Sequence, residues 1–120
     1  IYTSAIVGGT IPIALGTAFA LKQQNKEGSV YLFIGEMTSE TGAAHEAHKY
    51  ATAHDLPMKF VIEINHKSVC TDTLKTWNMK DYSLKGKKTI IISTHSVDML
   101  HGCDKIYQIK DQKLIEIIKK

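Results

Sequence analysis

The chain has 120 residues and a mass of 13.4 kDa, which is the size of a single domain. Its 43% hydrophobic and 22% charged residues are typical of a globular protein and exclude an intrinsically disordered chain. No apolar run approaches the roughly 20 residues that cross a bilayer, and no secretory signal pattern is visible. We therefore expect a protein that does not insert into a membrane.

Lysine supplies all 15 basic residues, and the formal net charge is +3. Nucleic-acid readers usually rely on arginine for bidentate contacts, so its absence argues against nucleic acid as a partner. The charge is uneven, because residues 1–78 hold 6 lysines and 7 acidic residues whereas residues 79–120 hold 9 and 5. Cys70 and Cys103 form no CxxC pair, which indicates free thiols in a reducing compartment and predicts a cytoplasmic location.

Two helices and two strands are expected in the first half of the chain. Helical spacing of apolar residues and alanine-rich composition mark the helices, and continuous apolar runs mark the strands. The helices are expected at residues 10–24 and 42–54, and the strands at residues 30–34 and 58–64. Because a strand, a helix and a strand follow one another, the sequence predicts a parallel βαβ unit.

The rest of the chain adds smaller elements. Residues 66–81 show no regular pattern. We expect a third strand at 88–93, a short helix at 97–102, and a hairpin of the alternating segments 105–109 and 113–118. The expected fold is therefore three-layer α/β with a mostly parallel sheet, followed by a C-terminal strand, helix and hairpin.

Polar residues follow both strands of the βαβ unit. Glu36 comes directly after Gly35, and Asn65 follows the second strand. Ligands of open α/β sheets bind at the carboxyl ends of strands, and carboxylate and amide oxygens suit Mg²⁺. The alternative is a solvated loop acid and a turn asparagine.

The wider string resembles the fingerprint of thiamine diphosphate-dependent enzymes. That fingerprint has Gly-Asp-Gly, a spacer and one or two asparagines, and here Gly35 and Asn65 are 30 positions apart. The residues that carry the resemblance are Ile6-Val7-Gly8-Gly9, Pro12, Gly35-Glu36-Met37, Gly42, Glu46-Ala47, Leu56-Pro57, Phe60-Val61, Glu63, Asn65, Cys70-Thr71-Asp72-Thr73 and Trp77. Residues 1–78 thus resemble the alpha-type subunit of 2-oxo acid dehydrogenases and transketolase-like enzymes.

The resemblance implies a Mg²⁺ site. Glu36 stands where the family has its metal-binding aspartate and is one methylene longer. Asn65 matches the amide ligand, and Lys67 falls where a backbone carbonyl completes the metal shell. Ile64 occupies the position where relatives often carry a first asparagine.

The resemblance also implies thiamine diphosphate, and with it a partner. The backbone carbonyl of Val7 would meet the aminopyrimidine, and Gly35 and Met37 would lie beside the diphosphate, with Met37 replacing a glycine. In the family, a glutamate on a separate pyrimidine-binding domain activates the cofactor, and nothing in this sequence resembles that domain. The expected partner is therefore a chain that carries this domain or a second copy, and the expected substrate is a small 2-oxo acid or ketose.

A second resemblance covers residues 84–117. The string Lys88-Thr89-Ile90-Ile91-Ile92-Ser93-Thr94-His95, followed by Cys103-Asp104-Lys105-Ile106-Tyr107, resembles the C-terminal end of an ABC-transporter ATPase domain. The resemblance implies that His95 contacts the terminal phosphate of a nucleotide; a turn-capping histidine is the alternative. The sequence contains no GxxxxGK[ST] phosphate loop, so this segment is not expected to hydrolyse ATP alone.

Three interpretations remain open. The first is a Mg²⁺–thiamine diphosphate-binding fragment that is inactive without its partner domain. The second is a nucleotide-associated segment centred on His95, and the third is a hybrid or chimeric domain without activity of its own. We place the boundary near residues 79–83, between a partial cofactor-binding domain at 1–78 and an ATPase-like segment at 84–120, packed as one domain. His45 and His48 lack the HExxH spacing and are interpreted as a solvated helix face.

Overall fold

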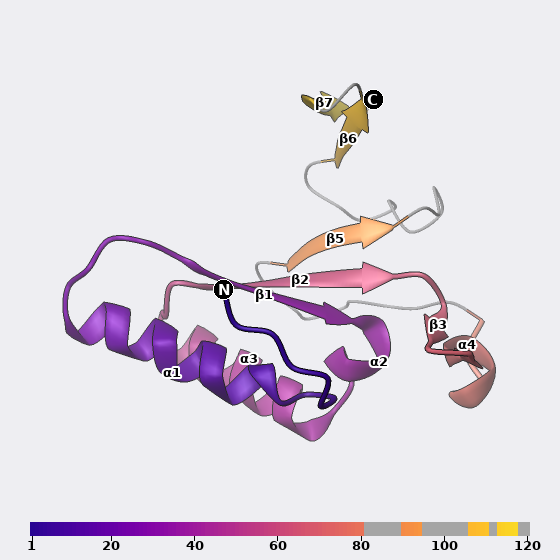
Figure 1. The fold of residues 1–120 in the computed structure, drawn as a ribbon, viewed down its shortest axis with the longest axis horizontal. Helices are drawn as coiled ribbons and strands as arrows, with labels where there is room; N and C mark the ends of the chain where they lie inside the picture. The colour runs from indigo at the N-terminus through magenta and orange to yellow at the C-terminus, as the bar shows by residue number, and fades with distance from the viewer. Residues whose placement is uncertain (81–89, 95–105, 111–112, 118–120) are drawn as a thin grey trace.

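The computed structural model describes residues 1–80, 90–94, 106–110 and 113–117, with side chains described for residues 1–80. Three strands form its main sheet: β1 (Val30–Gly35), β2 (Met58–Ile64) and β5 (Ile90–Thr94). They lie in the order β1-β2-β5, and both neighbouring pairs are parallel (Figure 1). The α/β class and the parallel βαβ unit are thereby confirmed, while the three-layer arrangement remains a prediction.

Two helices lie on one side of this sheet, α1 (Thr10–Gln23) and α3 (Gly42–Ala53) (Figure 1). Both agree with the predicted ranges to within one residue. Small residues of the helices, such as Ala18 and Ala47, are buried against large side chains of the strands. Among the residues whose burial is described, the hydrophobic core comprises Ile11, Ala18, Leu32, Ile34, Ala44, Ala47, Ala51, Leu56, Met58, Phe60, Ile62 and Ile64.

Polar contacts fix both ends of α3. At its start, the Thr41 side chain accepts a hydrogen bond from the backbone N–H of Ala44, which is an ordinary N-cap. At its end, Lys22 Nζ of α1 donates to the backbone oxygens of His54 at 2.6 Å and Asp55 at 3.1 Å. The lysine therefore ties the last turn of α1 to the negative end of α3.

Four short elements cluster beyond the carboxyl ends of β1 and β2 (Figure 1). Helix α2 (Glu36–Ser39) directly follows β1. Strands β3 (Lys67–Ser68) and β4 (Thr71–Asp72) form a small antiparallel hairpin after β2, and α4 (Thr73–Thr76) follows them. The sequence shows no regular pattern between residues 66 and 81, so the hairpin and α4 are elements that it does not predict.

The C-terminal part contributes an antiparallel pair, β6 (Ile106–Lys110) and β7 (Lys113–Ile117). β5 overlaps the predicted strand at 88–93, and its pairing with β2 puts it in the same sheet as the first half of the chain. The predicted helix at 97–102 lies outside the described residues. In the part of the chain that is described, no helix is long and apolar enough to cross a membrane.

Candidate functional site

The carboxyl ends of β1 and β2 lie next to each other. Because the two strands are parallel with Gly35 opposite Glu63, the residues that follow them leave the sheet at the same edge. Glu36 is the first residue after β1, and Asn65 is the first residue after β2. The structure thus brings together the two residues that sequence analysis singled out.

Glu36 is enclosed at this edge, with an exposed fraction of 1%. From the described residues, its carboxylate accepts two hydrogen bonds, one per oxygen. Thr73 Oγ1 donates to Oε1 at 3.0 Å, and the backbone N–H of Asn65 donates to Oε2 at 3.4 Å. The contact between Glu36 and Asn65 is therefore made through the Asn65 backbone.

Asn65 shapes the loop that brings Thr73 back to Glu36. Its Oδ1 accepts a hydrogen bond from the backbone N–H of Lys67 at 2.9 Å, which turns the chain into β3. His66, in between, has a left-handed backbone with φ +60°, and its carbonyl accepts from the Thr73 N–H at 3.1 Å. The hairpin and this bond place Thr73, whose exposed fraction is 0%, against the carboxylate.

Asp72 starts α4 beside Thr73. The Lys75 backbone N–H donates to Asp72 Oδ1 at 2.9 Å, and this bond is the main cause that holds the pKa of the Asp72 carboxyl below its ordinary value. Lys75 Nζ lies 3.8 Å from Oδ2 and acts in the same direction. Asp72 therefore stabilises the short helix whose first residue is Thr73.

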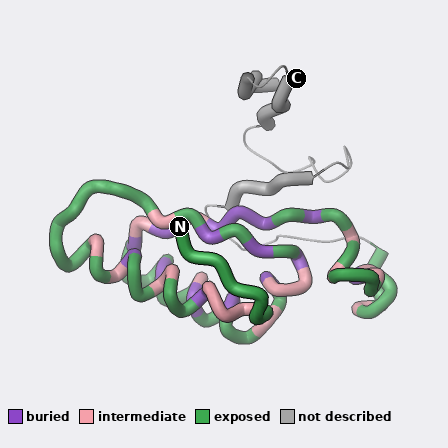
Figure 2. Tube along the Cα trace, viewed as in Figure 1, coloured by how far each residue is buried: buried purple, intermediate pink, exposed green. Residues whose placement is uncertain are grey.

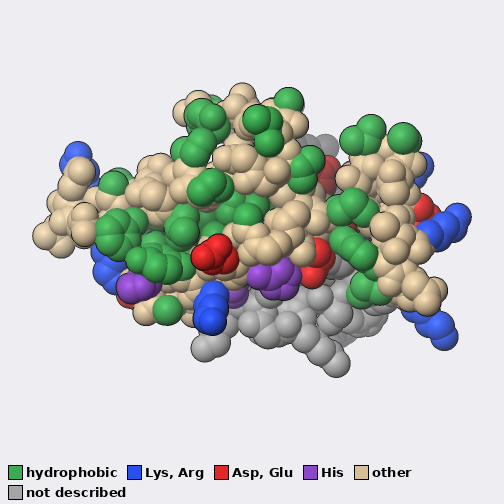
Figure 3. Space-filling model, turned by 90° about the horizontal axis from the view of Figure 1, so that it is seen from below, with side chains coloured by type: hydrophobic (Ala, Val, Ile, Leu, Met, Phe, Trp, Pro, Cys, Tyr) green, Lys and Arg blue, Asp and Glu red, His purple; other side chains and the backbone are tan. Residues whose placement is uncertain are grey.

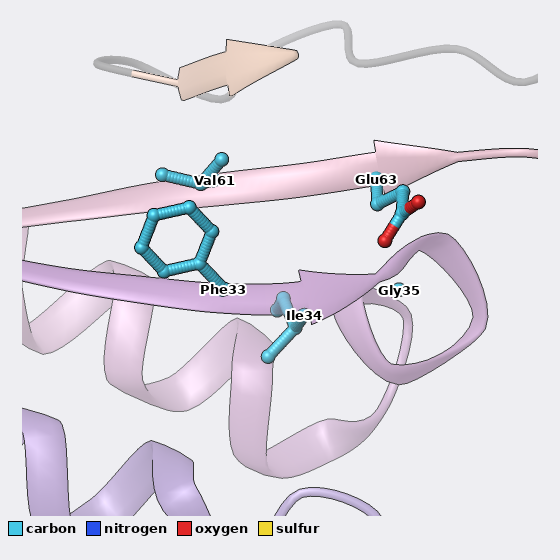
Figure 4. A pocket seen from close by; sticks show the side chains of 5 residues that line it. All are labelled: Phe33, Ile34, Gly35, Val61 and Glu63. Carbon is cyan, nitrogen blue, oxygen red and sulfur yellow. The ribbon is translucent and has the colours of Figure 1, made fainter. Parts of the chain in front are cut away.

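A shallow hollow of ≈ 300 Å³ adjoins the site on the face of the sheet opposite α1 and α3 (Figure 4). Phe33, Val61 and Glu63 line it from the two neighbouring strands, together with Ile34 and Gly35. A Cβ on Gly35 would meet no atom within 4 Å, so the space beside this residue is open. The sequence analysis did not identify this hollow.

The residues at the strand ends suit Mg²⁺ by their chemistry. A carboxylate, an amide oxygen and the backbone carbonyl of Lys67 are the hard oxygen donors that Mg²⁺ prefers. Among the described residues, Glu36 receives two hydrogen bonds and no ion pair, so its buried charge has no described cation beside it. A buried carboxylate needs hydrogen-bond donors or a positive charge beside it, and the two described hydrogen bonds supply part of that stabilisation.

Two other residues of the expected site lie apart from these contacts. Val7 is 72% exposed in the segment before α1 and takes no part in the hydrogen bonds around Glu36. Met37 is partly buried in α2. His95 and Cys103 lie outside the described residues, so the nucleotide contact of His95 stays a prediction, as does the boundary at 79–83.

The histidines of α3 form no metal cluster within the described residues, where no group of three or more His, Cys, Asp or Glu side chains gathers. His45 Nε2 lies 3.3 Å from Glu40 Oε2, and the ring of His48 packs on Phe60. Figure 3 shows histidine beside acidic side chains on this side of the molecule. The expectation that these histidines hold no zinc stays a prediction.

Thr73 is the residue of the candidate site that sequence reasoning missed, because the sequence shows it only within the string Cys70-Thr71-Asp72-Thr73. The signal for it was indirect, because Asp72 is a good N-cap and a buried acid needs hydrogen-bond donors. Neither fact alone pairs two residues that are 37 positions apart.

Open α/β sheets whose adjacent parallel strands are followed by polar side chains form a class of domain in which ligands bind at the carboxyl ends of the strands. Comparison with known proteins specifies the family. The family described as "Dehydrogenase E1 component" matches residues 1–102, and the chain belongs to this family. The match extends beyond residue 78, where the resemblance seen in the sequence ended.

Individual proteins that are similar to this chain have names that agree with this family. The chain is 33% identical over 82 residues to the pyruvate dehydrogenase E1 component subunit alpha of Rickettsia bellii, covering 68% of this chain and 25% of that protein. It is 37% identical over 62 residues to the same subunit of Zymomonas mobilis, covering 52% of this chain and 18% of the relative. The mitochondrial subunit of Saccharomyces cerevisiae is 26% identical over 97 residues, covering 81% and 23%. The chain thus spans about a quarter of the length of these curated relatives.

Proposed function

We propose that this chain is the Mg²⁺–thiamine diphosphate-binding portion of an enzyme that acts on 2-oxo acids or ketoses in the cytoplasm. The single observation that carries the proposal is the buried Glu36 carboxylate, which lies at the carboxyl end of β1 against Asn65 without a described counter-charge. Membership of the dehydrogenase E1 family supports the cofactor, and the donor chemistry supports the metal.

In this proposal, three groups hold the metal: the Glu36 carboxylate, the Asn65 amide oxygen and the Lys67 backbone carbonyl. Gly35 leaves space beside the sheet and Met37 flanks the diphosphate, while the Val7 carbonyl receives the aminopyrimidine. When bound, thiamine diphosphate supplies the carbanion that attacks a 2-oxo carbonyl. The task of these residues is to bind and orient the cofactor.

The proposal includes a partner. Among the described residues, Glu36 is the buried acid at the site, and in this proposal it binds the metal. We propose that a pyrimidine-binding domain, in a partner chain or a second copy, supplies the acid that activates the cofactor. The isolated chain then binds the cofactor and does not turn over substrate.

A thermal-shift titration tests this function. The chain is titrated with thiamine diphosphate with and without Mg²⁺, and ATP serves as the control ligand. A ligand at about 100 times its dissociation constant adds about 2.7 kcal/mol to the stability of the folded state, which raises Tm by several degrees for a domain of this size. We expect a shift that requires Mg²⁺ and is absent in Asn65→Ala. A wild-type chain that shows no shift with thiamine diphosphate contradicts the proposal.

A further inference from the structure

Thr73 and Glu36 form a buried pair from two distant parts of the chain. Both side chains are among the largest that are fully enclosed, with exposed fractions of 0% and 1%. Thr73 Oγ1 donates to Glu36 Oε1 at 3.0 Å. A hydroxyl that donates to a carboxylate makes a charge-assisted bond, which is stronger and more directional than a neutral one.

The Thr73 hydroxyl has little freedom to move. Its residue lies in the first turn of α4, which the Asp72 side chain caps. Its own backbone N–H donates to the His66 carbonyl at 3.1 Å, and its carbonyl accepts from the Trp77 N–H at 3.1 Å. The donor that meets Glu36 is therefore fixed by the fold before any ligand binds.

The two carboxylate oxygens are held unequally. Oε1 takes the short bond from Thr73, whereas Oε2 takes only the 3.4 Å contact from the Asn65 N–H. An N–H···O bond of that length lies beyond the usual range and is weak. Oε2 is thus the oxygen that can accept a further strong interaction, and it faces the backbone of Asn65.

Resting on the function proposed above, we propose that Thr73 is a positioning residue for the metal: its hydroxyl fixes Oε1 of Glu36 so that Oε2 is the metal-binding oxygen. A glutamate has one more rotatable bond than an aspartate, and freedom in that bond would be lost when the metal binds. The hydrogen bond from Thr73 removes this rotational freedom when the chain folds, so that it is not lost when the metal binds. Hydrogen bonds that orient a metal-binding side chain commonly have this role.

Manganese binding tests this inference without any enzymatic turnover. Mn²⁺ replaces Mg²⁺ because its free form gives an electron paramagnetic resonance signal that disappears on binding. The wild-type chain, Thr73→Val and Thr73→Ser are titrated with Mn²⁺ in the presence of thiamine diphosphate. Loss of a hydrogen bond behind a ligand typically costs 10–100-fold in metal affinity, so we expect a loss of about that size in Thr73→Val. Thr73→Ser keeps the hydroxyl and should recover most of the affinity.

A matched control is available on the same helix. Thr76 Oγ1 donates to the Asp72 carbonyl at 2.7 Å and is exposed, so Thr76→Val removes a hydroxyl of α4 that does not reach Glu36. We expect its Mn²⁺ affinity to equal that of the wild type. Circular dichroism on each variant establishes that it is folded at the titration temperature; if Thr73→Val does not fold, Thr73→Ala takes its place.

A double-mutant comparison separates positioning from general support of the fold. Glu36→Asp shortens the side chain and withdraws it from the hydroxyl, so Thr73→Val should cause little further loss in that background. If Thr73→Val binds Mn²⁺ as tightly as the wild type, this inference is wrong while the proposed function still stands. The same holds if Thr73→Ser loses as much Mn²⁺ affinity as Thr73→Val. A wild-type chain that binds no Mn²⁺ with thiamine diphosphate overturns the proposed function as well.

Discussion

The two faces of the main sheet are built by alternate residues of the same strands but end in different surroundings (Figure 2). On the face covered by α1 and α3, Leu32 and Ile62 are 4% and 1% exposed, whereas on the opposite face Phe33 is 73% exposed although Val61 of the central strand is 7% exposed. Parallel sheets are normally covered on both faces. The covered face therefore stabilises this chain. The open face carries apolar surface beside the candidate site, and the described residues do not bury this surface.

Substitution on the covered face should have the largest effect. Ile62→Ala leaves a cavity under the helices and is expected to lower the free energy of unfolding by about 2–5 kcal/mol. Phe33→Ala is the matched variant on the open face, where little burial is lost, and we expect a change within about 0.5 kcal/mol. Urea denaturation of both variants measures the difference; equal losses would show that the two faces do not differ in their contribution.

The N-cap of α3, one of the two helices on the covered face, is expected to contribute the next largest stability. Thr41→Ala removes the acceptor for the Ala44 N–H and is expected to cost about 1 kcal/mol of stability. Thr52→Ala, at an exposed position in the last turn of the same helix, is the control and should be neutral or slightly stabilising because alanine is the better helix former. Thermal unfolding of the two variants checks the prediction, which fails if Thr52→Ala is the more damaging.

The link between α1 and the end of α3 should contribute less. Lys22→Met keeps the apolar stem but loses the donor to the His54 and Asp55 carbonyls, and we expect a loss of about 0.5 kcal/mol. Lys26→Met changes the same charge in the loop before β1 and should leave stability unchanged. Urea unfolding at low ionic strength makes the comparison, and a larger effect of Lys26→Met would contradict it.

Asp72 gives the smallest effect, confined to acid pH. Its pKa is lowered in the folded chain, so its contribution is present above the unfolded pKa of about 4 and is lost as pH falls through the folded value. Asn is also a good N-cap, so Asp72→Asn keeps the start of α4 and loses the titration. We expect the stability of this variant to fall less steeply below about pH 4. The measurement is the urea midpoint as a function of pH. If the midpoint of Asp72→Asn falls below about pH 4 as steeply as that of the wild type, Asp72 does not make this contribution.

The long elements could be predicted because their patterns are local. β1 and β2 are apolar runs bounded by turn residues, and α1 and α3 begin and end within one residue of the predicted positions. Parallel pairing followed from the βαβ order alone. These features depend on hydrophobic periodicity and chain connectivity, which are legible in a single sequence.

The short elements and the enclosure of Glu36 were not predictable in the same way. β3, β4 and α4 depend on left-handed backbone at His66 and at Val69, a β-branched residue that rarely adopts it, and on the Asp72 cap. An acid after a strand has the same local sequence whether it is solvated or buried. Only the contact with Thr73, made through tertiary structure, distinguishes the two cases for Glu36.

The hydrogen bond between Glu36 and Thr73 also determines when the site can form during synthesis. The two residues are 37 positions apart, so Glu36 is translated 37 residues before its donor. At about 5–20 residues per second, that delay lasts about 2–7 s. During this interval the nascent chain holds an acidic side chain without its buried partner, and the site is completed only after α4 has been translated and has docked.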